Sequence, residues 1–230
     1  MTPRQIAALL AKTDLFGVLD EATLEQVAGR IRVRTVDRGQ TIFVQDEPGD
    51  RMFVLAEGAV KLVVRSAQGE VVELARHGPP AAFGEVALLD GGPRSATAEA
   101  IERSILLVVT RDDLIGLLRS DIHVVDAVLK SLGGMVRHAD RLASDLVFLD
   151  LQGRVARRLL ELAETGKGDT EGRTLRTGRL TQTELANMVG GSRQSVNLAL
   201  RTLEERGAIR LIGLTIELLD PDELRRRAGW

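Results

Sequence analysis

Between residues 37 and 110 the chain alternates short β-branched runs with regularly spaced glycines. Runs such as TIFV, MFVLA, VKLVV, VVELA and SILLVV have the length and composition of strands. Glycines separate them at intervals of about ten residues, the spacing of turns between antiparallel strands; they are Gly39, Gly49, Gly58, Gly69 and Gly78. The pattern predicts an antiparallel β-roll or jelly roll in this part of the chain.

The residues on either side of the predicted roll have helical spacing instead. Residues 1–36 are predicted to form short helices, with Leu24, Val27 and Ile31 on one face after Asp20, a predicted N-cap. The predicted fold class is therefore α+β. A length of 230 residues allows one large domain or two smaller ones.

From residue 122 to residue 146, apolar residues step by three and four along the chain. Such an a/d heptad pattern keeps one narrow apolar stripe along a long helix; its members are Val125, Val128, Leu132, Met135, Ala139, Leu142 and Leu146. The helix either packs on its own domain or pairs with a second copy of the chain. We favour the second interpretation, in which these seven residues form a homodimer interface.

The C-terminal part carries the signals of two short helices joined by a tight turn. A helical stretch, GRVARRLLELAE, and a glycine-rich loop at residues 166–179 come first. Thr181 and Glu184 then form a capping-box pattern, a Gly-Gly pair ends that helix, and Ser192 is placed to cap a second one. Two apolar runs around Gly213 follow as a predicted β-hairpin. This order predicts a winged helix-turn-helix, with two packed helices of an ordinary α+β domain as the alternative.

Composition removes several classes of site. The chain has no cysteine, which excludes disulfides, thiolate zinc sites, iron–sulfur clusters and a cysteine nucleophile. The histidines His77, His123 and His138 have no partner at metal-ligand spacing, so no metal site is predicted. No apolar run approaches the ~20 residues of a membrane span, and the N-terminus does not resemble a signal peptide, so we expect a cytoplasmic location without membrane contact. A small basic excess at the C-terminal end suits a nucleic-acid contact.

The stretch FGEVALLDGGPRSATAEA carries the polar residues of a candidate site. Glu85 directly follows Gly84, and Arg94 and Ser95 lie nine and ten residues after Glu85, across a Gly-Gly-Pro turn. One interpretation is an ion pair between Glu85 and Arg94 within a ligand-free turn. The other is a cradle for a small ligand that carries both hydroxyl groups and a phosphate.

Three motifs occur in one order along the chain. They are F-G-E followed by P-R-S-A-T, then F-L-D followed by G-R-V-A, then LTQTELANMVGGSRQSVN. Together they make the chain resemble the cyclic-AMP receptor protein and fumarate–nitrate regulator (CRP/FNR) family of bacterial transcription factors, over about residues 8–225. The resemblance implies a homodimer that is not an enzyme. It also implies a cyclic-nucleotide-binding roll, here residues 1–120, a dimerisation helix at 121–147 and a winged helix-turn-helix at 148–230.

The same resemblance implies the partners and the effector pocket. The partners are double-stranded DNA with a palindromic operator and RNA polymerase, and the effector is a cyclic nucleotide, with no metal, haem or iron–sulfur cluster. Arg94 would pair with the cyclic phosphate, Ser95 would donate its hydroxyl to that anion, and Glu85 would accept a hydrogen bond from the ribose 2′-hydroxyl. The backbone of Gly84 and Val86 would face the phosphate.

The base-reading half of the pocket departs from the family pattern. Members that bind cyclic AMP usually carry threonine followed by serine or asparagine on the dimer helix, where Ala139 and Asp140 stand here. Alanine donates nothing, whereas Asp140 is able to accept from an exocyclic amine and is assigned to the site. Cyclic AMP is the predicted effector, with another nucleotide, or none, as alternatives. A haem bound by His77 is not favoured, because a lone turn histidine is far commoner.

The second helix of the helix-turn-helix is predicted to enter the major groove. Arg193 matches the family arginine that reads guanine. Gln194 replaces the glutamate of many relatives and would pair with adenine, and Leu198 replaces a basic residue and would contact a thymine methyl or simply pack. The other residues assigned to the DNA contact are Thr181, Ser192, Ser195, Asn197 and Arg201.

Three classes of function follow from these observations. The favoured one is a sequence-specific DNA-binding regulator controlled by a small effector. A constitutive DNA-binding protein with a vestigial or differently specific pocket is the alternative. An enzyme is disfavoured, because the chain has no recognisable catalytic constellation.

Overall fold

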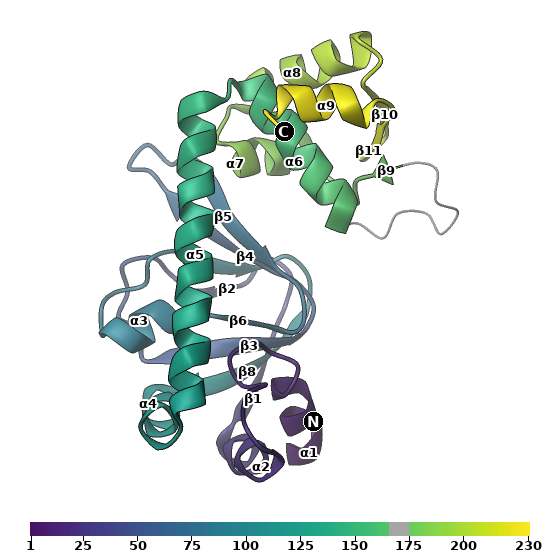
Figure 1. Cartoon of the computed structure of the whole chain (residues 1–230). Helices are drawn as coiled ribbons and strands as arrows, with labels where there is room; N and C mark the ends of the chain where they lie inside the picture. Colours follow the sequence, from purple (N-terminus) through teal and green to yellow (C-terminus); the bar gives the residue numbers. More distant parts are fainter. Residues whose placement is uncertain (166–174) are drawn as a thin grey trace. The chain divides into compact units, whose positions relative to one another are not determined.

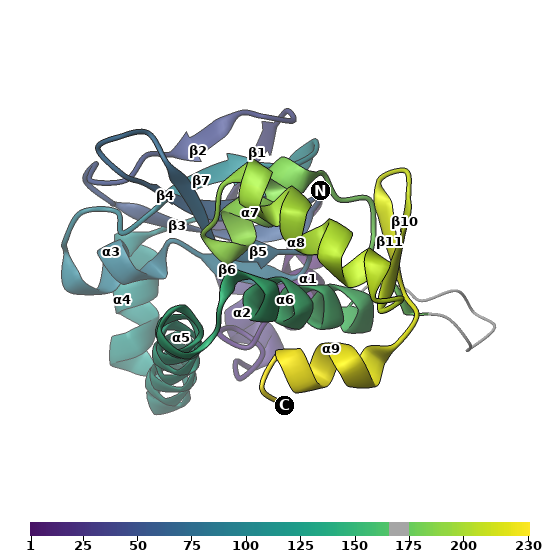
Figure 2. The same cartoon turned by 90° about the horizontal axis from the view of Figure 1, so that it is seen from above.

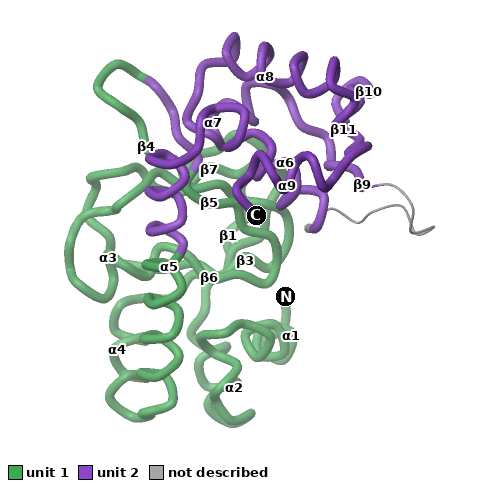
Figure 3. Tube along the Cα trace, turned by 45° about the horizontal axis from the view of Figure 1, so that its top comes forward, with its two compact units in different colours: residues 1–69, 74–137 green, residues 70–73, 138–230 purple. Residues whose placement is uncertain are grey.

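The computed structural model describes residues 1–165 and 175–230 of the chain. Two compact units make it up: the first holds residues 1–69 and 74–137, and the second holds residues 70–73 and 138–230 (Figure 3). The helix α5 (Ile122–Phe148) contributes residues to both units. Of the glycine-rich loop predicted at 166–179, residues 166–174 lie outside the described residues.

A roll of two four-stranded sheets with antiparallel strand pairs forms the centre of the first unit (Figure 1). One sheet has the strand order β1–β8–β3–β6 and the other the order β2–β7–β4–β5. The strands include all the predicted runs; their bounds are β1 Arg32–Val36, β2 Thr41–Phe43, β3 Arg51–Glu57, β4 Val60–Arg65, β5 Val71–His77, β6 Ala81–Phe83, β7 Thr97–Ala100 and β8 Ser104–Thr110. The predicted β-roll is confirmed.

The strand β1 occupies residues that were predicted to be helical. It runs antiparallel to β8, with Arg32 opposite Val108 and Val36 opposite Ser104. Three of its five residues are β-branched (Val33, Thr35 and Val36), a composition that favours a strand over a helix. The helical prediction for residues 32–36 was wrong because the helical spacing of the preceding segment was carried too far.

Phenylalanine rings fill the interior of the roll. Phe53 and Phe83 stack with their ring centroids 5.5 Å apart, and Phe43 lies 5.9 Å from Phe53. Burial of each such side chain contributes about 1.5–3 kcal/mol to stability. Phe83 is the last residue of β6, so this core fixes the position at which the next residue, Gly84, leaves the sheet.

Four shorter helices and the first part of α5 pack around the roll. They are α1 (Pro3–Leu10), α2 (Glu21–Arg30), α3 (Glu85–Asp90) and α4 (Arg111–Ser120). The predicted N-cap at α2 is confirmed, because the Asp20 carboxylate accepts the backbone N–H of Thr23 at 2.7 Å. A second apolar core joins these helices to the sheets and includes Leu10, Phe16, Leu107, Leu114 and Val128.

The helix α3 lies where only a turn was predicted. Gly84 precedes it with φ +80° and Gly91 follows it with φ +73°, both left-handed conformations that glycine adopts without strain. Ala87 and Leu88 bury its apolar side. The run VALL inside the candidate stretch was the signal of this helix.

The second unit has the winged helix-turn-helix arrangement that the sequence predicts (Figures 1 and 2). Its helices are α6 (Leu151–Thr165), α7 (Gln182–Val189), α8 (Arg193–Glu205) and α9 (Pro221–Arg227), together with the last residues of α5. A three-stranded sheet of order β10–β11–β9 forms the wing, with bounds β9 Leu175–Arg176, β10 Ile209–Ile212 and β11 Thr215–Leu218. Helix α9 and strand β9 were not predicted.

The turn between α7 and α8 is held closely against α6. Gly190 ends α7 with φ +63°, and a Cβ atom on Gly191 would lie 2.8 Å from Cδ1 of Leu151. Only glycine permits this approach without a shift of the neighbouring side chain. The buried residues of all three helices then form one core, which includes Leu159, Leu185, Val196 and Leu200.

An arginine ties the end of α5 to the rest of the second unit. Arg157 of α6 forms an ion pair with Asp145 of α5 and donates a hydrogen bond to the carbonyl of Ala228. Its guanidinium also lies 5.6 Å from the ring centroid of Trp230. Burial raises the pKa of Asp145 and the charge of Arg157 opposes that rise, so the ion pair keeps a half-buried carboxylate compensated.

Candidate functional site

Arg94 lies on a loop whose backbone is held by two hydrogen bonds to a neighbouring segment. Its N–H donates to the carbonyl of Glu47 at 2.8 Å, and its carbonyl accepts the N–H of Asp46 at 2.9 Å. The side chain is only 4% exposed. Its Nη1 donates to the carbonyl of Gly84 at 2.8 Å and its Nη2 donates to the carbonyl of Arg51 at 2.6 Å. Backbone carbonyls therefore orient the guanidinium, which forms no ion pair among the described residues.

One donor of this guanidinium has no partner. Nε of Arg94 is buried and makes no hydrogen bond within the described residues, and one face of the group lies 4.2 Å from the ring centroid of Phe43. Burial lowers the pKa of Arg94, while the nearby charge of Asp50 opposes that change. Because arginine still keeps its proton, the site holds a buried positive charge with one N–H that no group of the described residues accepts.

Two glycines make room for the guanidinium. A Cβ atom on Gly49 would lie 2.9 Å from Nε of Arg94 and 2.5 Å from Cβ of Ala87. A Cβ atom on Gly84 would lie 3.0 Å from Nη1, and φ at Gly84 is +80°. Any larger residue at either position would displace Arg94, so these glycines are part of the site.

Glu85 faces a cavity and not Arg94. No ion pair joins the two side chains among the described residues, so the ion-paired turn considered from the sequence is not what forms. Burial raises the pKa of Glu85, while its own backbone N–H and the charge of Arg94 lower it. The carboxylate thus has acceptor capacity that no basic side chain uses.

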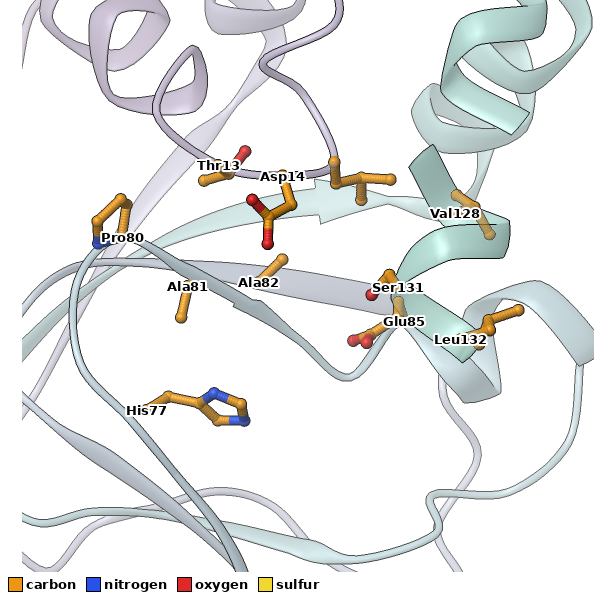
Figure 4. Close-up of a pocket in the computed structure, with 11 residues that line it drawn as sticks. Thr13, Asp14, His77, Pro80, Ala81, Ala82, Glu85, Val128, Ser131 and Leu132 are labelled. Atoms are coloured by element: carbon orange, nitrogen blue, oxygen red, sulfur yellow. The ribbon is translucent and has the colours of Figure 1, made fainter. Parts of the chain in front are cut away.

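The cavity beside Glu85 has a volume of about 220 Å³ and is lined by three parts of the first unit. Figure 4 shows the carboxylates of Glu85 and Asp14 and the ring of His77 lying around the same space. Ser131 of α5 adds a hydroxyl group. These groups are able to accept hydrogen bonds from hydroxyl or amino groups of a ligand. Cavities that enclose a whole drug-sized ligand are larger, at about 300–1,000 Å³, so this one fits part of such a ligand.

Sequence reasoning missed part of this lining. Asp14 and Ser131 were not predicted, and His77 was interpreted as a lone turn residue although its ring also stacks on Phe83 with centroids 5.9 Å apart. Ser131 interrupts an apolar helix face one turn after Val128, which is the signal that could have found it.

The remaining predicted effector residues do not line the cavity. Ser95 is exposed beside Arg94, and Val86 is half-buried in the first turn of α3; neither lines the cavity. Asp140 is an exposed residue of α5 in the second unit. Of the predicted effector residues, Gly84 is therefore in direct contact with Arg94 through its carbonyl, and Glu85 follows Gly84 in the chain.

The helix α5 confirms the predicted long helix, and part of the predicted seam is buried within the single chain. Val128 is 8% exposed and belongs to the core of its own unit, and Leu132 packs partly against the same core. Val128 is therefore unavailable to a second chain. Met135 and Leu142 are also half-buried in the single chain.

A different apolar stripe of α5 is exposed. Leu129 and Val136 are each 60% exposed, and Ile122 lies seven residues before Leu129 and is exposed as well. They combine with the exposed or half-buried members of the predicted stripe into one heptad series, which is Ile122, Val125, Leu129, Leu132, Val136, Ala139, Ala143 and Leu146. The two series differ at three positions and are rotated by about 100° on the helix, and the burial of Val128 favours the series that contains Leu129.

The capping residues of the helix-turn-helix are as predicted. The N–H of Thr181 donates to the Glu184 carboxylate at 2.8 Å, and the N–H of Glu184 donates to Oγ1 of Thr181 at 3.2 Å. Ser192 caps α8 by accepting the N–H of Ser195 at 3.1 Å. The Thr181 hydroxyl also donates to Glu184, so its hydrogen bonds are already used in the cap.

The first turns of α8 expose the predicted polar face. Val196, Ala199, Leu200 and Leu203 are buried, which turns the opposite side of the helix to solvent. The exposed residues on that side are Arg193, Gln194, Ser195, Leu198 and Arg201, and Asn197 is half-buried. Side chains with hydrogen-bonding groups at a free helix N-terminus suit the edges of base pairs and phosphates.

The wing adds two arginines that the sequence analysis did not select. Arg210 of β10 and Arg176 of β9 both pair with the buried carboxylate of Glu217, at 3.2 and 2.8 Å. Both arginine side chains remain substantially exposed. Two arginines share one carboxylate, so this part of the wing keeps a net positive charge, which suits phosphate contacts.

Comparison with known proteins assigns both units to known domains. Residues 33–121 match the family model described as a cyclic nucleotide-binding domain, and residues 153–227 match the one described as a Crp-like helix-turn-helix domain. The chain is 35% identical over 221 residues to a CRP-like cAMP-activated global transcriptional regulator of Mycobacterium tuberculosis, covering 96% of this chain and 98% of that protein. The chain belongs to the CRP/FNR family of transcription regulators.

Other CRP/FNR members show the same correspondence. The cyclic AMP receptor protein of Thermus thermophilus is 35% identical over 185 residues, which cover 80% of this chain and 82% of that protein. The solved structure of the c-di-GMP-responsive global regulator CLP of Xanthomonas campestris matches with a TM-score of 0.77 at 21% identity, covering 86% of this chain and 99% of that one. At 21% identity, the likeness to CLP shows a common fold.

The family assignment settles the class of function. CRP/FNR proteins are transcription regulators and not enzymes, with a cyclic nucleotide-binding domain and a DNA-binding helix-turn-helix. Among the described residues, no helix is long and apolar enough to cross a membrane.

Proposed function

We propose that the chain is a homodimeric transcription regulator whose binding to a palindromic operator is controlled by cyclic AMP. The main support for this effector is the buried Arg94 guanidinium, whose Nε has no hydrogen-bond partner among the described residues. Two relatives are named for cyclic AMP, the cAMP-activated regulator of M. tuberculosis and the cyclic AMP receptor protein of T. thermophilus.

The phosphate and the ribose have separate partners in this proposal. The cyclic phosphate approaches Nε of Arg94 and the exposed hydroxyl of Ser95, with the backbone of Gly84 and Val86 alongside. The 2′-hydroxyl donates to the Glu85 carboxylate, which faces the cavity. Hydroxyl, carboxylate and guanidinium together favour a ligand with both a sugar and an anion.

The base is the least defined part of the effector. Ala139 donates no hydrogen bond, and Asp140 accepts from an exocyclic amine in our assignment. This departure from the family pattern favours weak binding of cyclic AMP or binding of another nucleotide. The same departure supports the second candidate function, a constitutive regulator with a vestigial pocket.

The DNA contact is proposed for the N-terminal half of α8. Arg193 reads guanine O6 and N7, and Gln194 reads adenine N6 and N7. The contacts to phosphates and neighbouring bases come from Ser192, Ser195, Asn197 and Arg201. Two such helices in a symmetric dimer require half-sites about one helical turn apart. RNA polymerase is the further partner we expect, and the cytoplasm the location.

The dimer forms in this proposal through the exposed heptad stripe of α5. Leu129 and Val136 occupy core positions, and Ala139 and Ala143 let the two helices approach closely where the stripe continues. The proposed organisation is an effector domain at residues 1–120, a dimerisation helix at 121–147 and a DNA-binding domain at 148–230.

Thermal unfolding with a panel of nucleotides tests the effector. A ligand that binds only the folded protein stabilises it by about 2.7 kcal/mol at one hundred times its Kd. We expect cyclic AMP to raise the unfolding temperature more than cyclic GMP, cyclic di-GMP or 5′-AMP at equal concentration. A larger shift with another nucleotide would change the ligand, and no shift with any of them would favour the constitutive regulator.

A further inference from the structure

One large apolar side chain stands on the exposed face of α8. Leu198 is 67% exposed, whereas the other apolar residues of this fully described helix are buried in the core of the unit. Leu198 therefore does not pack, which was one of the two roles open to it from the sequence. Its carbonyl accepts the hydroxyl of Thr202 at 3.0 Å, and only the side chain is offered to solvent.

The neighbours of Leu198 are the residues proposed to contact DNA. Gln194 precedes it by four residues and Arg201 follows it by three, so the three side chains lie on one helix face. A single leucine among polar and basic residues is too small an apolar surface for a stable protein interface. Its surroundings have the chemistry of a nucleic-acid surface.

We propose that Leu198 reads the 5-methyl group of a thymine in the major groove. The inference rests on the proposed function, namely that α8 enters the groove. The methyl group of thymine is the apolar feature that the major-groove edges of the base pairs present, and an aliphatic side chain distinguishes it by contact alone. A leucine at this position therefore selects thymine where a basic side chain would select guanine or a phosphate.

Helix geometry places this thymine within the half-site. Four residues of α-helix rise about 6 Å, and successive base pairs are about 3.4 Å apart. The thymine read by Leu198 is therefore about two base pairs from the adenine read by Gln194. An operator selected by this protein should carry both bases at that spacing in each half-site.

The test removes the methyl group and the leucine separately. The full chain, with cyclic AMP present, first selects its operator from random duplexes. Each thymine of the half-site is then replaced by deoxyuridine, which lacks the 5-methyl group and keeps O4, and the Kd is measured by fluorescence anisotropy. At one position we expect about fourfold weaker binding, the value for one buried methyl group of about 0.8 kcal/mol.

The variant Leu198→Ala completes the cycle. It should bind the thymine duplex more weakly than the wild type and should not distinguish thymine from deoxyuridine at that position. Leu219→Ala serves as the matched control, because Leu219 is an exposed leucine of the same unit that lies outside both α8 and the wing strands, and its replacement should preserve the fourfold difference.

Two results would overturn the inference. One is a wild-type affinity that no thymine-to-deoxyuridine replacement changes. The other is a Leu198→Ala variant that still distinguishes the two bases as the wild type does. A wild type that enriches no palindromic duplex at all would instead contradict the proposed DNA contact, and the inference would fall with it.

Discussion

The guanidinium of Arg94 lies over the ring of Phe43, 4.2 Å from the ring centroid. The ring covers one face of the cation, and two backbone carbonyls take its Nη1 and Nη2 groups. The arginine is thus oriented before any ligand arrives, with Nε as the donor left over. A preoriented donor loses little conformational entropy on binding, which favours affinity for an anion.

Arg94→Ala should lower the affinity for cyclic AMP by roughly tenfold to a hundredfold, since about 1.5–3 kcal/mol is lost with a charge-assisted hydrogen bond. The affinity of Arg94→Lys should lie between those of Arg94→Ala and the wild type, because lysine keeps the positive charge but lacks the planar, forked donors of arginine. Isothermal titration calorimetry measures both. Arg65→Ala is the control, because Arg65 pairs with Glu99 away from Arg94 and its loss should not affect binding. Equal affinity of Arg94→Ala and the wild type would remove Arg94 from the site.

Glu85→Gln should change how stability depends on pH. Burial raises the pKa of Glu85 in the folded state above its ordinary value of 4.5, so the folded protein holds this proton more strongly than the unfolded chain. Stability from this group is therefore present below pH 4.5 and is lost as the pH rises through the raised pKa. The ligand-free variant should match the wild type at acid pH and exceed it at neutral pH, as measured by chemical unfolding. A difference independent of pH would contradict this.

The proposed dimer seam predicts different effects for substitutions at the neighbouring residues Val128 and Leu129 of α5. Leu129→Glu places like charges in the proposed dimer seam and should give a monomer at micromolar concentration by sedimentation, with the fold intact. Val128→Ala should keep the dimer and lower the free energy of unfolding by about 1–2 kcal/mol, because it leaves a cavity in the core of the unit. The reverse pattern would restore the seam predicted from the sequence.

Arg157→Met should destabilise the second unit by about 2–4 kcal/mol, since it leaves the half-buried carboxylate of Asp145 without its partner. The double variant Asp145→Leu with Arg157→Met should recover most of this loss, because no charge is then left unpaired. Trp230 is the single tryptophan of the chain and lies over Arg157, so its fluorescence during urea unfolding reports on this region. Additive losses in the double variant would show that the ion pair contributes nothing.

The sequence predicted correctly those helices and strands whose structure depends on residues close together in the chain. The capping box of Thr181 and Glu184 and the N-caps Asp20 and Ser192 are all formed, and the glycine-spaced runs are strands. Such features depend on residues three or four apart. The strand β1 was not predicted because its structure depends on pairing with β8, about seventy residues further along the chain.

The sequence suggested some residues of the candidate site but not the contacts that they make. The sequence identified Glu85 and Arg94 as a pair of opposite charges, and only the fold shows that they face different surroundings. The carbonyl partners of Arg94 and the cavity residue Ser131 come from segments distant along the chain. The heptad pattern likewise showed that α5 has an apolar stripe, but two frames share four positions, and the burial of Val128 is what favours the frame that we propose.

The affinity for the selected operator, measured with and without cyclic AMP, tests the central claim most directly. For the wild type we expect cyclic AMP to strengthen DNA binding about 5- to 150-fold, which corresponds to a coupling free energy of about 1–3 kcal/mol. Arg94→Ala should bind the operator without the nucleotide as the wild type does and should lose this enhancement. A wild-type affinity that is the same with and without cyclic AMP would contradict the account and identify a regulator that does not respond to this nucleotide.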